Sequence, residues 1–195
     1  MWYNENMIIS KKKKFVFASI PKTGTTSIER TLMKYEDAFA TVSSKKHTPF
    51  LQVEHLPLPY FKFCFFRNPW DQFVSLYEYR KERRKFEKLP FNACFDEWVE
   101  NAILCFEYKI ETEYGFILDA SGFPIPGIKV YKYEEIYDAW GDICNRLNIT
   151  DKLPHYNYTK RRHYSTYYTN KTKHIIARKC WREIEMMQYQ FKESE

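Results

Sequence analysis

Residues 15–32, FVFASIPKTGTTSIERTL, restrict the fold of this chain more than any other segment. The segment begins with a short apolar run at 15–20, rich in Phe, Val and Ile, which predicts a strand covered on both faces. A tight turn follows, and Ile28 and Leu32 then stand four positions apart, as on the buried face of a helix. A strand that turns sharply into a helix directs unpaired backbone N–H groups and the positive end of the helix dipole to one point. The segment therefore predicts an anion-binding site.

The side chains of this turn suit an anionic group such as a phosphate. Lys22 supplies a full positive charge, and Gly24 lets the backbone approach a ligand closely. Four hydroxyl groups accompany them, those of Thr23, Thr25, Thr26 and Ser27. A helix cap would explain one hydroxyl, but not the whole set. The lysine precedes the glycine, so the G-x-x-x-x-G-K-[ST] pattern of P-loop kinases and GTPases is absent.

Strands and helices alternate along the chain. A second buried strand is predicted at 61–66, and residues 116–133 predict a hairpin that runs into another strand. Further helices are predicted at 68–85, 91–104, 134–147 and 172–187, and long loops at 36–60 and 148–171. This alternation predicts an α/β fold with a mostly parallel central sheet flanked by helices. We expect a single domain over residues 1–195, since a chain of this size buries roughly 70% of its unfolded surface.

Charge and aromatic content narrow the range of ligands. Lysine and arginine outnumber aspartate and glutamate by 31 to 25, and the net charge of +6 favours an anionic ligand without identifying it. Phe, Trp and Tyr make up 19% of the chain, which fits either aromatic walls around a cleft or an aromatic core. We interpret the lysine run at 11–14 as a charged lead-in to the first strand rather than a nucleic-acid signal.

The five cysteines form no C-x-x-C pair, so the sequence indicates neither a zinc site nor a disulfide framework. The apolar segment MIIS at 7–10 is too short for a signal peptide, and no stretch is long enough to span a membrane. These features predict a cytoplasmic protein with no membrane partner.

A second set of polar residues follows the strand at 61–66, in the segment FRNPWDQFVSLY. Arg67 leaves the end of that strand, where a planar guanidinium can bind a phosphate through two hydrogen bonds. Asn68 and Pro69 form a natural helix start, with Asp71 in the first turn. Ser75, two turns along, can donate to the same group. A surface salt bridge is the alternative interpretation of Arg67.

The two polar segments described above resemble motifs of one enzyme family. IPKTGTTS resembles the 5′-phosphosulfate loop of sulfotransferases that use 3′-phosphoadenosine 5′-phosphosulfate, and FRNPWDQFVSLY resembles their 3′-phosphate motif. The resemblance is greatest to the carbohydrate branch that contains heparan sulfate 2-O-sulfotransferase and bacterial relatives. It continues in order through KHTPF, YKYEEI, LPHYNYTKRRHYSTYY and REIEMMQYQF, and so covers nearly the whole chain. It implies a P-loop-like, three-layer fold.

The resemblance also implies roles for the two motifs. Residues 22–27 bind the phosphosulfate group, and Lys22 stabilises the charge that grows on the leaving phosphate. Arg67 and Ser75 bind the 3′-phosphate, and the product is adenosine 3′,5′-bisphosphate. We expect no metal, because the transferred sulfuryl group carries less charge than a phosphoryl group. No aspartate follows the FCFF strand to hold magnesium, which agrees with this expectation.

The remaining site residues rest on shorter matches. By position, His47 in KKHTPF corresponds to the histidine that acts as the base in the 2-O-sulfotransferase branch, with His55 as the alternative. In the basic loop TKRRHY, the resemblance implies nucleotide contacts from Lys160, Arg161 and Tyr164. Which of Lys160, Arg161 and Arg162 points inward stays open.

The predicted activity is therefore sulfuryl transfer to a hydroxyl of a carbohydrate or small molecule. One alternative is an ATP- or GTP-dependent phosphotransferase, and another is a non-enzymatic basic module that binds nucleic acid or sulfated glycan. Two departures from the family are visible. Gln72 stands where relatives commonly have arginine, and the membrane anchor of the Golgi members has no counterpart in this sequence.

Overall fold

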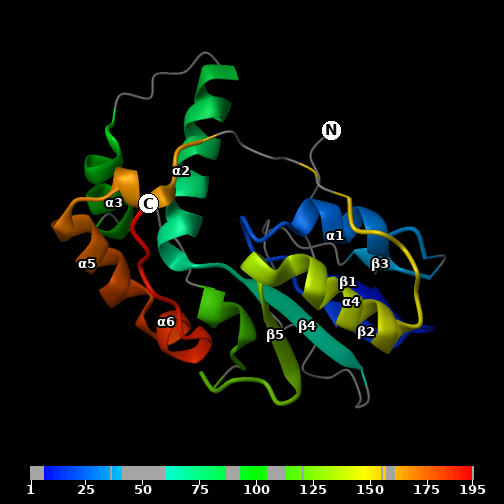
Figure 1. The fold of residues 1–195 in the computed structure, drawn as a ribbon. Coiled ribbons are helices and arrows are strands. Elements are labelled where there is room, and N and C mark those ends of the chain that lie inside the picture. The colour runs from blue at the N-terminus through cyan, green and yellow to red at the C-terminus, as the bar shows by residue number, and fades with distance from the viewer. Residues whose placement is uncertain are drawn as a thin grey trace. The chain divides into compact units, whose positions relative to one another are not determined.

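The computed structural model describes residues 7–35, 37–40, 60–86, 93–104, 113–119, 121–154, 156 and 161–194. Contacts divide the chain into two compact units. The first comprises Met1–Phe66 and Glu113–Asn157, and the second comprises Arg67–Thr112 and Tyr158–Glu195 (Figure 1). A single domain over residues 1–195 stays a prediction.

The first unit contains a sheet with the strand order β3-β1-β2-β4-β5. Its described strands are β1 (Ile8–Ser10), β2 (Phe15–Phe17), β3 (Phe39–Ala40), β4 (Phe61–Phe66) and β5 (Ile128–Lys132). β2 pairs in parallel with β4, and β4 with β5, whereas β1 pairs antiparallel with β2 and β3. The sheet is therefore mixed, and the prediction of a mostly parallel sheet is wrong. The difference lies in β1 and β3, which are too short to be recognised by periodicity.

The lysine run at 11–14 occupies the turn of the hairpin between β1 and β2. Asp37 stabilises this turn, because its carboxylate accepts hydrogen bonds from the Ser10 hydroxyl, at 2.9 and 3.0 Å, and from the Lys12 amide at 2.6 Å. Lys14 completes the reversal in the left-handed region, at φ 52°. The run leads into the strand at Phe15–Phe17, as predicted, but β1 precedes it, so the run is also a hairpin turn.

The core of the first unit lies between one face of the sheet and two helices, α1 (Thr25–Leu32) and α4 (Ile136–Leu147). Alternate residues of each strand share this face, because successive strand side chains point to opposite sides. The core cluster consists of Ile8, Phe15, Phe17, Ile28, Leu32, Phe63, Phe65, Tyr131, Ala139, Trp140, Ile143, Leu147 and Ile149. The α/β class is confirmed. Both helices lie against the same face (Figure 1), so the three-layer arrangement stays a prediction.

The segment before β5 forms less strand than the sequence predicts. The segment begins with a 3₁₀ helix, η3 (Glu113–Ile117). The sequence predicts a hairpin at 116–133, and among the described residues of that range one β-bridge is formed before β5, between Leu118 and Pro124. A second 3₁₀ helix, η4 (Tyr133–Glu135), connects β5 to α4.

The second unit is helical in the part of the chain that the structure describes. Its elements are α2 (Pro69–Phe86), α3 (Phe95–Leu104), η5 (Tyr164–Tyr167), α5 (Asn170–Lys179) and α6 (Trp181–Met187). The single helix predicted at 172–187 is two helices that break at Cys180 (φ −107°, ψ 31°). Thr169 starts α5 earlier than predicted, because its side chain and that of Thr172 form a capping box.

Aromatic side chains build much of the core of the second unit. The ring of Tyr77 packs edge-on against Phe95 with centroids 5.3 Å apart, and Tyr168 packs on Phe95 at 4.8 Å. Trp98 joins this cluster at 5.6 Å from Tyr77. Part of the high aromatic content of the chain therefore belongs to a packed core. None of the helices among the described residues combines the length and apolarity needed to cross a bilayer.

Candidate functional site

The loop between β2 and α1 turns through two residues with a left-handed backbone conformation. Lys22 and Gly24 both lie in the left-handed region, at φ 67° and 75°. Gly24 is the N-cap of α1, and the cap has no side-chain hydrogen bond. None of the four hydroxyls of the turn therefore caps this helix. The Ser27 amide donates to the Gly24 carbonyl at 3.1 Å, and helix geometry directs the N–H groups of this first turn towards the N-terminal end of α1.

Gly24 is also required by its neighbours. A Cβ atom at this position would lie 2.9 Å from Cε2 of Tyr133 and 3.0 Å from Cδ1 of Ile136. The backbone of the loop thus rests directly on η4 and the start of α4. This contact gives the segment YKYEEI a physical role, which is to support the loop from behind.

Two of the predicted hydroxyls hold the loop in shape. The Thr23 hydroxyl is buried and donates to the Ile20 carbonyl at 2.9 Å, which closes the turn. The Ser27 hydroxyl accepts from the Tyr156 amide at 3.1 Å. Thr25 is buried, and its hydroxyl has no hydrogen-bond partner among the residues the structure describes. Thr26 and Lys22 are partly exposed. Binding of a ligand by these five residues stays a prediction.

A buried carboxylate behind the loop has no counterpart in the sequence prediction. Glu29 of α1 is 8% exposed and accepts a hydrogen bond from the Ser19 hydroxyl, which is 1% exposed. The bond joins the apolar run at 15–20, which contains β2, to α1. A glutamate within a predicted amphipathic helix gives no signal of this pairing, because the partner depends on how the loop folds back.

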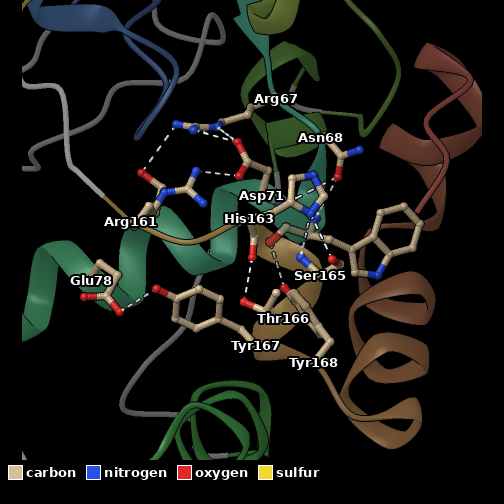
Figure 2. Close-up of polar contacts among 12 residues, drawn as sticks. Arg67, Asn68, Asp71, Glu78, Arg161, His163, Ser165, Thr166, Tyr167 and Tyr168 are labelled. Atoms are coloured by element: carbon tan, nitrogen blue, oxygen red, sulfur yellow. Dashed lines mark hydrogen bonds and ion pairs between the residues drawn. The ribbon is translucent and has the colours of Figure 1, made fainter. Parts of the chain in front are cut away.

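In the second unit, Arg67 contacts two side chains of α2, and Figure 2 labels one of them, Asp71, beside Arg67. Its Nε and Nη2 atoms lie 2.8 and 2.6 Å from Oδ2 of Asp71, and its Nη1 donates to the Ser75 hydroxyl at 3.4 Å. The three residues are spaced four apart, so they share one face at the start of the helix. Arg67 and Ser75 are each 8% exposed, so the alternative of a surface salt bridge does not fit Arg67.

The helix start is the one predicted. Oδ1 of Asn68 accepts from the Trp70 amide at 3.1 Å, and Pro69 is the first helical residue. Nδ2 of Asn68 also donates to the Gln190 carbonyl at 3.1 Å. These bonds fix the first turn of α2, and therefore the backbone that carries Asp71.

Arg161 reaches the same carboxylate from a distant part of the sequence. Its Nη2 lies 2.5 Å from Oδ1 of Asp71, so Asp71 lies between two guanidinium groups (Figure 2). Burial favours the neutral form of Asp71, but the positive charges of Arg67 and then Arg161 outweigh burial and lower the pKa of Asp71. The nucleotide contacts of the basic loop stay a prediction, but the structure shows where two of its arginines lie. Arg161 joins this cluster, whereas Arg162 lies over the ring of Tyr167, 5.4 Å from its centroid.

The segment after Arg161 is fixed by local bonds. Nδ1 of His163 caps η5 by accepting from the Ser165 amide at 3.4 Å. Tyr164 is buried, and its hydroxyl accepts from the Lys192 amide at 2.7 Å. Its ring packs edge-on against Phe191, with centroids 5.4 Å apart. The structure thus assigns Tyr164 packing contacts, and its predicted contact with a nucleotide stays a prediction.

Three predicted site residues, His47, His55 and Lys160, lie outside the described residues. The choice of a general base therefore stays a prediction. Within the described ranges, no group of three or more His, Cys, Asp or Glu side chains is arranged to hold a metal ion.

Comparison with known proteins gives one result that covers almost the whole chain. The model of a family described as the sulfotransferase family matches residues 5–191. No curated protein matches the chain.

Proposed function

Because the chain belongs to the sulfotransferase family, we propose that it transfers a sulfuryl group from 3′-phosphoadenosine 5′-phosphosulfate to a hydroxyl of a carbohydrate or small molecule. The observation that carries the choice of donor is the buried pairing of Arg67 with Ser75 at the start of α2. A guanidinium beside a hydroxyl suits a phosphate on the sugar of a nucleotide.

The loop between β2 and α1 suits the other end of such a donor. Gly24 brings the backbone close to a ligand, and the first amides of α1 favour a negative group. When bound, the donor supplies a sulfuryl group whose bond to the leaving phosphate breaks as its bond to the acceptor oxygen forms. Lys22 stabilises the negative charge that grows on the phosphate side, while the amides of residues 23–27 hold the reacting group in place.

The acceptor hydroxyl loses its proton during the transfer, and a side chain must take it. We assign this role to the imidazole of His47, with His55 as the alternative, because a histidine can be neutral near pH 7 and accept a proton. The assignment follows from the position of KKHTPF in the sequence resemblance.

Isothermal titration calorimetry tests the choice of donor. The wild-type protein should bind adenosine 3′,5′-bisphosphate in preference to ATP with magnesium, and Arg67→Ala should abolish that preference. Arg146→Ala is a matched control, because it removes the same charge from a half-exposed side chain that pairs with Asp142 on α4. Lys22→Ala should reduce turnover far more than affinity for the bisphosphate. Preference for ATP with magnesium would instead favour a phosphotransferase and contradict the proposal.

A further inference from the structure

Asp71 makes more contacts than its place in the first turn of α2 requires, because the helix dipole alone already favours a carboxylate there. One of its oxygens accepts from two nitrogens of Arg67, and the other lies 2.5 Å from Arg161. The side chains involved are 10% exposed for Arg67, 19% for Asp71 and 14% for Arg161. The carboxylate thus bridges two largely buried cations, and one of them, Arg161, is 90 residues away from Asp71 in the sequence.

Two guanidinium groups in such a place repel each other, and the repulsion is stronger where water is excluded. A carboxylate between them removes that penalty and fixes the planes of both groups, since each guanidinium offers a rigid fork of donors. The three groups together keep a net charge of +1. The cluster is therefore a preorganised cationic site that still favours an anion.

We propose that Asp71 is a positioning residue, which holds Arg67 and Arg161 side by side so that both bind the 3′-phosphate of the nucleotide donor. This inference rests on the proposed function. The Ser75 hydroxyl, 3.4 Å from Nη1 of Arg67, adds a hydroxyl group beside that guanidinium. Arg161 is then a second phosphate ligand, and Asp71 acts through both arginines without touching the nucleotide.

A competing explanation of the Asp71 contacts predicts the opposite change in binding affinity when Asp71 is replaced. If Asp71 only occupied the anion site, it would compete with the phosphate, and replacing it by a neutral residue would strengthen binding. If Asp71 positions the arginines, the same replacement weakens binding although it makes the protein more positive. The direction of the change in affinity therefore decides between the two roles.

The test compares Asp71→Asn with wild type by calorimetry, using adenosine 3′,5′-bisphosphate and adenosine 5′-phosphate. We expect Asp71→Asn to weaken binding of the bisphosphate roughly tenfold or more, the size of a lost charge-assisted hydrogen bond. Affinity for the 5′-phosphate, which has no 3′ group, should stay unchanged. Glu78→Gln is the matched control, since it removes one negative charge from the same helix at a residue that accepts from the Tyr167 hydroxyl.

Arg161→Ala provides a second variant, which keeps the Arg67–Asp71 pair, in case Asp71→Asn does not fold. It should also weaken binding of the bisphosphate alone, and Asp71→Asn should cost less affinity on the Arg161→Ala background than in wild type. Tighter binding by Asp71→Asn, a change equal to that of Glu78→Gln, or an unchanged affinity in Arg161→Ala would overturn the inference. A wild-type protein that binds the two nucleotides equally would instead overturn the proposed function.

Discussion

Replacing Gly24 by alanine tests whether the loop between β2 and α1 has the backbone described above. Alanine pays roughly 1–2 kcal/mol in the left-handed region that Gly24 occupies at φ 75°. The added Cβ would lie 2.9 Å from Tyr133 and 3.0 Å from Ile136, and such overpacking costs roughly 1–3 kcal/mol more. Both neighbours are only partly buried side chains, which can shift, so we expect a net loss of about 2–3 kcal/mol.

Two other glycines of the same unit separate the two contributions. Gly127 has φ 76° with nothing within 4 Å of a Cβ, so Gly127→Ala should show the conformational cost alone, about 1 kcal/mol. Gly115 has neither a positive φ nor a close neighbour, so Gly115→Ala should be close to neutral. Urea unfolding followed by circular dichroism gives the free energy of unfolding of each variant.

Equal losses for Gly24→Ala and Gly127→Ala would refute the packing of the loop on Tyr133. A neutral Gly24→Ala would refute the left-handed cap as well. The proposed function adds one consequence, which calorimetry can follow. If the loop amides hold the phosphosulfate end, Gly24→Ala should weaken nucleotide binding, whereas Gly127→Ala should not.

For two further substitutions, the structure predicts the direction of the change in stability. Gly141→Ala should stabilise the protein by roughly 0.5–1 kcal/mol in urea unfolding, because Gly141 is exposed inside α4 and a Cβ there meets nothing within 4 Å. Burial acts to raise the pKa of Asp71, but Arg67 and Arg161 lower it on balance, so its contribution to stability is complete above about pH 4 and lost as the pH falls through the lowered value. The stability deficit of Asp71→Asn relative to wild type should therefore shrink progressively in unfolding curves measured from pH 4 down through the lowered pKa of Asp71, and a deficit independent of pH would contradict this.

The elements that the sequence predicts well are those with strong local signals. The strand β4, the helix α2 and its Asn68 cap follow from an apolar run and from capping residues at fixed spacing. The stripe of Ile28 and Leu32 is confirmed for the same reason, since both side chains belong to the core. Local signals of this kind do not depend on the rest of the fold.

The missed features depend on contacts between distant residues. β1 and β3 are strands because they pair with each other and β1 pairs with β2, and neither has enough residues to show a period of its own. The break at Cys180 interrupts an apolar spacing that continues on both sides of it. Pairing and packing decide these elements, and a single sequence does not record them.

The position of Asp71 has a local explanation in the sequence, although the residue also makes a contact with a distant residue. Its place in the first turn of α2 is explained by the helix dipole, which already favours a carboxylate there. The spacing of Arg67, Asp71 and Ser75 also puts all three on one face, so the sequence alone permits the Arg67–Asp71 bond. Only the fold of the second unit brings Arg161 to the other oxygen and gives the carboxylate two cations to hold. An acidic residue at a helix start that follows an arginine by four positions therefore has two possible roles, and a second cation distinguishes the positioning role from simple capping.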